Sequence, residues 1–225
     1  MSFCEILKAF PEGSDSASRL ALAAKRMGYQ GIMICNEAPD RLFRPKAVGQ
    51  IKGVDVIFGA EVSASNPRAL RSRVSSLRPK FPFLAFSGYS EEMARAACED
   101  PNMDLLLLRP ELRRPLGIVS AKAARQNQVA IGFDISPLVR WRGSARSRWL
   151  ENVSRSLELS RKFDLALAIT MGARSHLDLR SPRDLAALAE VAGFEPHEAE
   201  AALELPGKLV KLNERNWLGP GVELL

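Results

Sequence analysis

Short apolar runs alternate along the chain with longer segments in which apolar residues recur every three or four positions. The runs occupy residues 3–7, 31–35, 54–58, 83–86, 105–108, 129–133 and 165–169. Runs of four or five apolar residues are typical of strands that are buried on both faces. The segments between them have the periodicity of amphipathic helices, so the pattern predicts a βα repeat with a parallel sheet.

Several of the predicted helices have clear start signals. A Ser, Asn or Asp side chain before a first turn can accept a hydrogen bond from the free N–H groups there. After the last apolar run, Ser181 has this position, Pro182 follows it at the first helical residue, and Asp184 comes three residues after the cap. The other predicted caps are Asp15 or Ser16, Asn66, and Ser90.

Seven parallel strands fit either an open sheet or a closed barrel. No Gly-rich nucleotide fingerprint follows the first run, and the runs are uniform in length. These features favour a TIM-like α/β barrel of about seven parallel strands alternating with helices; no eighth strand is predicted. Residues 1–218 are expected to form this single domain, and residues 219–225 a loose tail.

Three segments have patterns that are less regular. Residues 38–52 contain two prolines and a glycine, and we expect an irregular basic connection there. Residues 138–148 are rich in arginine and are predicted to form a long basic loop before a helix that ends at Phe163. Pro206-Gly207 is expected to separate two short helices at 194–203 and 208–215.

In a parallel barrel the carboxyl ends of the strands meet at one mouth, where functional residues collect. Three carboxylates there could hold a divalent metal ion through oxygen ligands. The chain has only two histidines, His176 and His197, and these cannot assemble a zinc or dinuclear site of ordinary type. The sequence therefore favours a polar mouth or a vestigial metal site. The predicted mouth residues are Asn36, Glu37, Glu61, Ser87, Arg109, Asp134 and Thr170.

The chain carries a net charge of +6, and arginine supplies most of the excess. Arginine suits planar, bidentate contact with phosphate, so the charge favours a polyanionic partner. Trp141 and Trp149 flank the basic loop and could stack on unpaired bases, although we expect Trp149 to pack in the core. No nucleophile elbow, Walker loop or paired Cys-x-x-Cys motif is present.

Compartment and membrane association follow from the cysteines and the apolar runs. Cys4, Cys35 and Cys98 are odd in number and lie in apolar surroundings, as expected of reduced cysteines in the cytoplasm. No basic N-terminal region precedes an apolar run, and no apolar stretch is long enough to span a membrane. We therefore expect a cytoplasmic protein that neither is secreted nor spans a membrane.

Two arginines in the loop before Ser181 have two alternative interpretations. Arg174 and Arg180 follow a predicted parallel strand, at the end where function collects. They could bind phosphate, or they could pair with the nearby carboxylates of Asp178 or Asp184. The sequence leaves both interpretations open.

Two stretches resemble one known family. Residues 15–31 are similar to the first-helix signature of the protein component 3 family of archaeal ribonuclease P. Residues 152–185 resemble that family's long C-terminal signature, through Leu-Ser-Arg-Lys-Phe at 159–163, Thr-Met-Gly-Ala at 170–173 and Asp-Leu-Arg-Ser-Pro-Arg-Asp-Leu at 178–185. Residues 197–205 and 211–215 also fit. Glu5, where the family more often has aspartate, and Met171, where it usually has a small hydroxyl residue, depart from the pattern.

The resemblance implies a barrel related to the polymerase-and-histidinol-phosphatase (PHP) hydrolases, without their histidine metal cluster. It also implies a subunit of the ribonucleoprotein that removes the 5′ leader from precursor tRNA. The expected partners are ribonuclease P RNA, protein component 2 and the other protein subunits, with precursor tRNA met indirectly. The isolated chain would have no catalytic residues, metal or cofactor of its own, and Mg²⁺ would reside on the RNA. The alternative is a stand-alone PHP-like metal-dependent phosphoesterase.

Binding to such an RNA would depend on basic side chains that neutralise phosphates without reading bases. The predicted RNA-binding residues are Arg68, Arg109, Lys122, Arg140, Arg148, Arg174 and Arg180.

Overall fold

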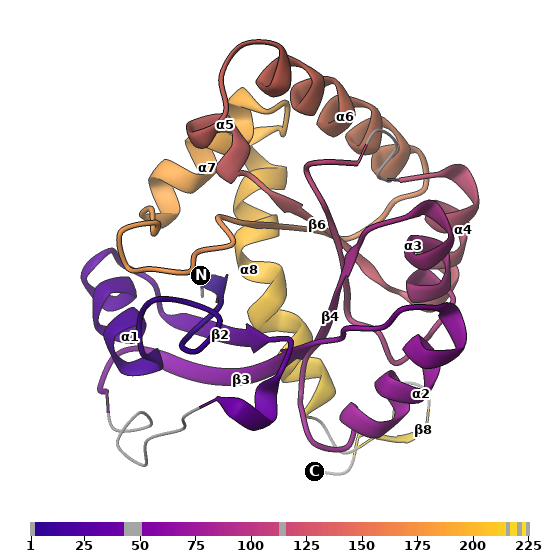
Figure 1. The fold of residues 1–225 in the computed structure, drawn as a ribbon, viewed down its shortest axis with the longest axis horizontal. Coiled ribbons are helices and arrows are strands. Elements are labelled where there is room, and N and C mark those ends of the chain that lie inside the picture. Colours follow the sequence, from indigo (N-terminus) through magenta and orange to yellow (C-terminus); the bar gives the residue numbers. More distant parts are fainter. Residues whose placement is uncertain (1–2, 43–50, 113–115, 215–216, 220–221, 224–225) are drawn as a thin grey trace.

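The computed structural model describes residues 3–42, 51–112, 116–214, 217–219 and 222–223. Seven parallel strands form one sheet in which each strand pairs with its neighbours in chain order. Helices follow the strands and surround them, as Figure 1 shows, so the predicted TIM-like α/β barrel is confirmed. The strands are β1 Cys4–Leu7, β2 Gly31–Asn36, β3 Asp55–Glu61, β4 Leu84–Gly88, β5 Leu105–Leu108, β6 Ala130–Asp134 and β7 Leu167–Thr170.

The helices pack their apolar stripes against the outside of the strands. A short 3-10 helix, η1, spans Pro39–Arg41, within the segment predicted to be irregular; residues 43–50 of that segment lie outside the described part of the chain. None of the described helices is long and apolar enough to cross a membrane. The helices are α1 Ala17–Arg26, α2 Pro67–Leu77, α3 Glu91–Cys98, α4 Ile118–Asn127, α5 Ser136–Arg140, α6 Gly143–Lys162, α7 Pro182–Val191 and α8 Pro196–Asn213.

The predicted helix starts are confirmed at α1, α2, α3 and α7. Ser16 accepts a hydrogen bond from the N–H of Arg19, so Ser16 is the cap and Asp15 is free for another role. In the same way, the caps of α2, α3 and α7 each accept from the N–H three residues later; these caps are Asn66, Ser90 and Ser181. Local sequence chemistry therefore fixes where these helices begin.

The barrel closes where β1 approaches the end of β7. A single parallel bridge joins Leu7 to Ala173. Beside it, the buried Glu5 carboxyl accepts hydrogen bonds at Oε1 from the Thr170 hydroxyl at 2.8 Å and from the Met171 N–H at 2.7 Å. The Glu5 side chain thus supplies part of the link between β1 and the end of β7, a link that backbone hydrogen bonds provide between the other neighbouring strands.

The interior of the barrel is filled by side chains from the strands, among them Ile6, Met33 and Leu105, and by Phe83 just before β4. Helix α8 closes the amino-terminal end of the barrel, because its Val210 belongs to this interior cluster. The end of α8 is held there by Asn213, which donates to the carbonyl of Pro82 at 2.8 Å and to Oδ1 of Asp104 at 2.7 Å, just before β4 and β5. Figure 1 shows α8 running across the barrel behind the strands.

Two of the predicted irregular segments are helical. Most of the basic loop expected at 138–148 lies in α5 and in the first turns of the 20-residue α6. Arginine is a good helix former, and the buried stripe Trp149, Val153 and Leu157 anchors α6, so this prediction was wrong.

The break expected at Pro206-Gly207 was also wrong. Pro206 is buried inside the continuous helix α8, where packing against the barrel outweighs the hydrogen bond that a proline removes. After α8, β8 Trp217–Gly219 pairs antiparallel with β9 Val222–Glu223. From the sequence, the domain was expected to end at residue 218 and a loose tail to begin at residue 219. That boundary falls inside β8.

Candidate binding site at the barrel mouth

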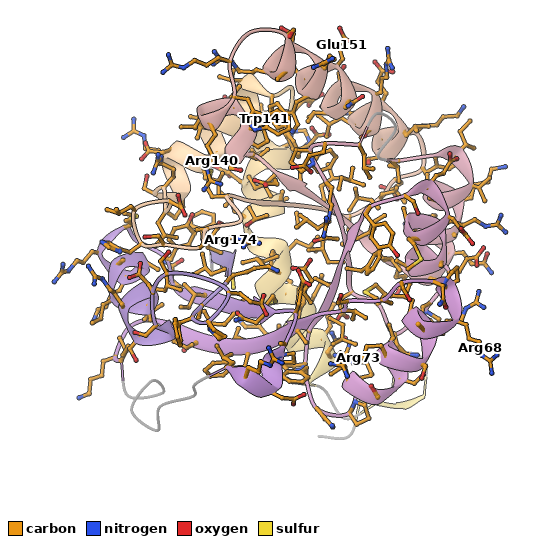
Figure 2. All side chains as sticks on the ribbon, viewed as in Figure 1. Arg68, Arg73, Arg140, Trp141, Glu151 and Arg174 are labelled. Carbon is orange, nitrogen blue, oxygen red and sulfur yellow. The ribbon has the colours of Figure 1, made fainter. Side chains whose placement is uncertain are left out.

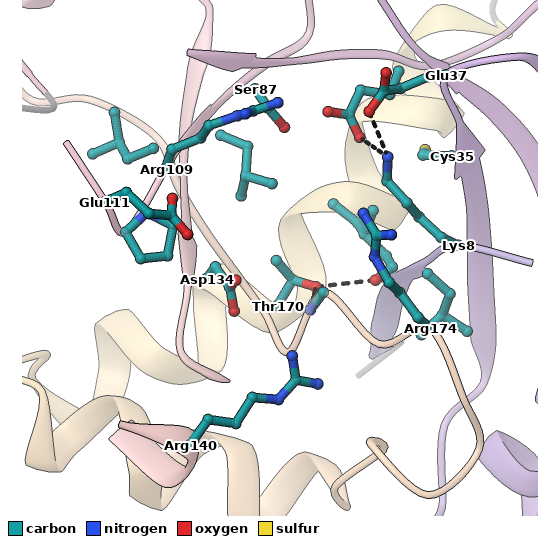
Figure 3. Close-up of a pocket in the computed structure, with 17 residues that line it drawn as sticks. Lys8, Cys35, Glu37, Ser87, Arg109, Glu111, Asp134, Arg140, Thr170 and Arg174 are labelled. Carbon is teal, nitrogen blue, oxygen red and sulfur yellow. Dashed lines mark hydrogen bonds and ion pairs between the residues drawn. The ribbon is translucent and has the colours of Figure 1, made fainter. Parts of the chain in front are cut away.

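A cavity of about 290 Å³ opens at the carboxyl ends of the strands. Six of the seven predicted mouth residues line it, namely Glu37, Glu61, Ser87, Arg109, Asp134 and Thr170. The exception is Asn36, which is buried and exchanges two hydrogen bonds with the backbone of Ala9 at 3.0 and 2.7 Å. Three further basic residues, Lys8, Arg140 and Arg174, also line the cavity (Figure 3).

Lys8 lies among three carboxylates at one side of the mouth. Its Nζ is 2.8 Å from Glu61, 3.1 Å from Glu37 and 3.3 Å from Glu12. Burial alone would lower the pKa of Lys8, but the contacts with Glu61 and Glu37 outweigh it and raise that pKa above its ordinary value. The amine therefore stays charged and serves as a fixed cation rather than as a nucleophile.

The loop after β1 gives Glu12 a second role. Its two oxygens accept hydrogen bonds from the N–H groups of Glu37 at 2.9 Å and Ala38 at 2.8 Å. Burial works to raise the pKa of Glu12, but these N–H groups and Lys8 lower it below its ordinary value. Glu12 thus ties the first loop to the end of β2 and keeps Lys8 in place.

The described residues contain no group of three His, Cys, Asp or Glu side chains that could hold a metal ion. The carboxylates of Glu37 and Glu61, which such a site would need, already contact the Lys8 ammonium. Both histidines lie elsewhere, since His176 pairs with Asp15 and the exposed His197 lies 3.5 Å from Glu195. The mouth therefore has the geometry of a polar pocket with its own built-in cation.

Asp15 holds the loop after β7 against the start of α1. Its Oδ2 is 2.7 Å from both the backbone nitrogen and the Nδ1 of His176, and it also accepts from the Ser175 hydroxyl at 3.0 Å. Burial works to raise the pKa of Asp15, yet the hydrogen bonds from His176 and Ser175 lower it to about 2. This network fixes the loop that carries Arg174.

Two acids with raised pKa values, the buried Glu5 and the half-buried Asp134, lie on either side of Thr170. Burial raises the pKa of Glu5 to about 8, although the hydrogen bonds from Met171 and Thr170 oppose that rise. Burial likewise raises the pKa of Asp134, whose carboxylate accepts from the N–H of Ser136 at 2.8 Å. Both groups therefore hold protons more readily than ordinary carboxylates.

Three arginines from different elements enter the cavity (Figure 3). Arg109 follows β5, Arg140 ends α5, and Arg174 follows β7. Arg140 pairs with Asp178 at 2.8 Å. The side chains of Arg109 and Arg174 make no hydrogen bond or ion pair within the described part of the chain, so both guanidinium groups are available to a ligand.

The backbone at Arg174 is fixed by the first loop. Its carbonyl accepts from the N–H of Ser14 at 2.7 Å. A β-carbon at Gly13 would collide with the carbonyl oxygen of Lys8, so only glycine allows this close approach. Gly172, at φ +55°, makes the turn after β7.

The Arg180 guanidinium, in contrast, contacts the backbone of its own loop. Its NH1 donates to the carbonyl oxygens of Leu177, Asp178 and Leu179, at 3.2, 3.4 and 2.7 Å. Within the described residues, neither Arg174 nor Arg180 forms the ion pair with Asp178 or Asp184 that the structural interpretation expected. Asp184 instead accepts from the hydroxyl of its own helix cap at 2.8 Å.

The remaining predicted RNA-binding residues lie away from the mouth. Arg68 is on α2, Lys122 on α4 and Arg148 on α6, and all three are exposed. Figure 2 shows Arg68 at the outer edge of the molecule, whereas Arg140 and Arg174 lie near the middle of the barrel. The structure thus divides the seven predicted residues between the mouth, the outer helices and the loop before α7.

The tryptophans are only partly available for stacking. Trp149 is buried in the core, as expected, and Trp141 is half-buried against the same core. Sequence reasoning missed Lys8 and Glu12 as mouth residues. One signal for Lys8 was its position directly after the first apolar run, at the carboxyl end of β1.

Comparisons with known proteins were made for the whole chain. Residues 5–218 match a family model described as RNase P subunit p30. Ribonuclease P protein component 3 of Methanosarcina mazei is 36% identical over 99% of this chain and 94% of its own length.

Solved structures share the fold at lower identity. A chain of an archaeal ribonuclease P, solved by cryo-electron microscopy with mature tRNA, is 24% identical, with a TM-score of 0.82 over 99% of this chain and 97% of its own. The histidinol phosphate phosphatase of Lactococcus lactis, solved with zinc, L-histidinol and phosphate, has a TM-score of 0.56 at 14% identity, over 86% of this chain and 95% of its own. These likenesses show the fold, an α/β barrel as expected from the sequence.

Proposed function

Because this chain belongs to the RNase P subunit p30 family, we propose that it binds ribonuclease P RNA through phosphate contacts and stabilises the active shape of that RNA. The chain is a protein subunit of ribonuclease P. The proposed direct partner is protein component 2, and the particle would also contain the other protein subunits. Precursor tRNA would meet the chain indirectly, through the assembled particle in the cytoplasm.

The observation that carries this proposal is the set of exposed basic side chains on rigid helices. Arg68, Lys122 and Arg148 project from three different helices, and none forms an ion pair or side-chain hydrogen bond with a described residue. Arginine and lysine at fixed positions can neutralise RNA phosphates without reading bases. Such contacts lower the repulsion that an RNA must overcome to fold.

In this proposal the chain contributes no catalytic residue, and the RNA removes the 5′ leader of precursor tRNA. The Lys8 ammonium among the mouth carboxylates supports this division of labour, because it places a protein cation where a metal-dependent hydrolase would need its metal. The chain would need no cofactor, and Mg²⁺ would be bound by the RNA.

The test is reconstitution of the particle from ribonuclease P RNA, component 2 and this chain. Adding the chain should lower the Mg²⁺ concentration that half-maximal cleavage of precursor tRNA requires. A triple variant, Arg68→Ala with Lys122→Ala and Arg148→Ala, should raise that concentration again. The matched control is Arg26→Ala with Arg183→Ala, two exposed arginines on α1 and α7, which should behave like the wild type. An unchanged Mg²⁺ requirement with and without the chain would contradict the proposal.

A further inference from the structure

We propose that the barrel mouth is a binding pocket for a terminal phosphate group, a phosphomonoester, held between Arg109 and Arg174. The pocket follows from the cavity and the side chains that line it. That an RNA end is one source of the phosphate rests on the proposed function. A free small phosphate is the other source with the same chemistry. The outer helices, by contrast, would contact phosphates within a continuous RNA chain.

The first argument is the direction and freedom of the two guanidinium groups. Arg109 and Arg174 enter the cavity from opposite sides of the mouth (Figure 3). Neither side chain has a hydrogen-bond or ion-pair partner among the described residues. Two planar forks facing one space can each donate two hydrogen bonds to a phosphate. Ser87, whose hydroxyl has no partner among the described residues, lines the same cavity.

The second argument is that most of the acidic groups in the cavity already contact a cation or a backbone N–H group. Glu37 and Glu61 contact the Lys8 ammonium at 3.1 and 2.8 Å. Asp134 accepts a backbone hydrogen bond, and burial raises the pKa of its carboxyl, which weakens its repulsion of an anion. Glu111 is exposed at the rim, where water screens its charge. The Lys8 ammonium offsets one of these carboxylate charges, and the two unpaired guanidinium groups remain available to an incoming phosphate.

The third argument concerns the shape of the cavity and favours a terminal phosphate. Helix α8 and the interior side chains close the opposite end of the barrel, so a ligand can enter only from the mouth. A phosphodiester within a strand would have to bring both flanking nucleotides into a cavity of about 290 Å³. A terminal phosphate is attached to only one nucleotide, so only that nucleotide must approach the cavity. Its charge of about −2 matches the two free guanidinium groups.

The fourth argument is preorganisation of the arginine backbones. The carbonyl of Arg174 is held by Ser14, and the loop that contains it is held by Asp15 through His176. Arg109 directly follows β5, whose register with β6 is fixed by the sheet. Fixed anchors reduce the entropy lost when a phosphate is bound.

The experiment is calorimetric titration of the wild-type chain with three probes at neutral pH and low salt. The probes are inorganic phosphate, a 5′-phosphorylated dinucleotide and the same dinucleotide with a 5′-hydroxyl end. We expect the phosphorylated dinucleotide to bind and the hydroxyl form to bind at least tenfold more weakly. Comparable affinity for inorganic phosphate would identify a free phosphate as a sufficient ligand, whereas binding of the phosphorylated dinucleotide alone would identify an RNA end.

The variant Arg109→Gln with Arg174→Gln should lose roughly tenfold in phosphate affinity for each arginine, as expected for charge-assisted hydrogen bonds. The control Arg26→Gln with Arg183→Gln removes the same charge from α1 and α7 and should bind as the wild type does. Equal affinity for the phosphorylated and hydroxyl forms would contradict the proposed phosphate pocket. Equal losses of phosphate affinity in both double variants would contradict it as well. Salt-dependent binding of full-length ribonuclease P RNA, measured in parallel, reports on the proposed function separately.

Discussion

The guanidinium of Arg140 lies 2.8 Å from the carboxylate of Asp178, which joins the end of α5 to the loop after β7. The other oxygen of Asp178 accepts from the N–H groups of Arg174 and Ser175. Asp178 therefore orders the loop but leaves the side chain of Arg174 unpaired. Two neighbouring arginines therefore have different surroundings: the Arg174 guanidinium has no partner among the described residues, whereas the Arg180 guanidinium donates to three backbone carbonyls.

Replacing these two arginines singly should give different results. Arg174→Ala should leave the free energy of unfolding within about 0.5 kcal/mol of the wild type, because the side chain is exposed and unpaired. Its affinity for ribonuclease P RNA should fall, and Arg174→Lys should recover only part of that affinity, since a point charge lacks the bidentate fork. Arg180→Ala should instead lower the unfolding free energy by about 1 kcal/mol, because three carbonyl contacts are lost. Urea unfolding and filter binding measure the two effects. A large stability loss in Arg174→Ala would contradict its assignment.

Affinity for ribonuclease P RNA should depend steeply on salt. Each phosphate contact releases counterions, so the logarithm of the affinity should fall linearly with the logarithm of the salt concentration, with a slope of magnitude on the order of several. The Arg68→Ala variant should reduce that magnitude by roughly one. Binding isotherms between 50 and 200 mM salt, roughly the range over which such slopes are read, give the measurement. A slope near zero would show that phosphate contacts do not dominate.

The isolated chain should not turn over precursor tRNA or p-nitrophenyl phosphate with Mg²⁺, Mn²⁺ or Zn²⁺. The reason is the Lys8 ammonium among the mouth carboxylates, together with the lack of a three-residue metal-binding group in the described ranges. The assay follows product release across a panel of these metals. Metal-dependent turnover that disappears in Glu61→Ala or Asp134→Ala would favour the stand-alone phosphoesterase.

Removing the Lys8 charge should destabilise the fold at neutral pH. Lys8→Met leaves the buried Glu61 carboxylate without its cation, which costs about 3–5 kcal/mol for a buried pair. Lys80→Met, at an exposed lysine, is the control and should change the unfolding free energy little. Urea unfolding at neutral pH checks this, and a loss in Lys8→Met no larger than that in Lys80→Met would contradict a stabilising role of the ion pair.

Glu5 makes the stability of the barrel fall with rising pH. The pKa of Glu5 is raised from 4.5 to about 8 in the folded state, so between these values the folded chain binds more protons than the unfolded chain. By linkage, this group's contribution to stability declines as the pH rises through that interval. Glu5→Gln keeps an oxygen that can accept from Met171 and Thr170 but cannot ionise. Its stability relative to the wild type should therefore increase from pH 5 to pH 9, as measured by chemical denaturation, and a constant difference would refute the assignment.

The sequence predicted the elements whose causes are local. The caps at Asn66 and Ser181 and the turn at Gly172 each depend on residues within a few positions, so they could be located from the sequence. The barrel itself followed from the alternation of apolar runs. The position of the mouth could be predicted as well, because the carboxyl ends of all parallel strands lie at the same end of the barrel, whatever segments connect the strands.

The errors arose where distant contacts decide the structure. Pro206 stops an isolated helix, but α8 continues through it because the barrel interior packs against its far end. Two of the three carboxylates that contact Lys8, Glu37 and Glu61, come from distant segments, and no local pattern points to them. Arg140 pairs with Asp178, whereas one of the two open interpretations had paired that carboxylate with Arg174 or Arg180. The spacing of residues along the chain does not show which of several cations will contact a given carboxylate.

The hydrogen bond between Glu5 and Thr170 joins residues that are 165 positions apart. During synthesis β1 leaves the ribosome well before its partner at the end of β7 and before the covering helix α8. Until then the first strand has an open edge, and such long-range closure is slow because the entropy of the long loop must be overcome first. We therefore expect nascent chains that end before β7 to be the most prone to aggregate or to recruit chaperones. When α8 emerges from the ribosome, it would then convert an open sheet with an unpaired strand edge into a closed barrel.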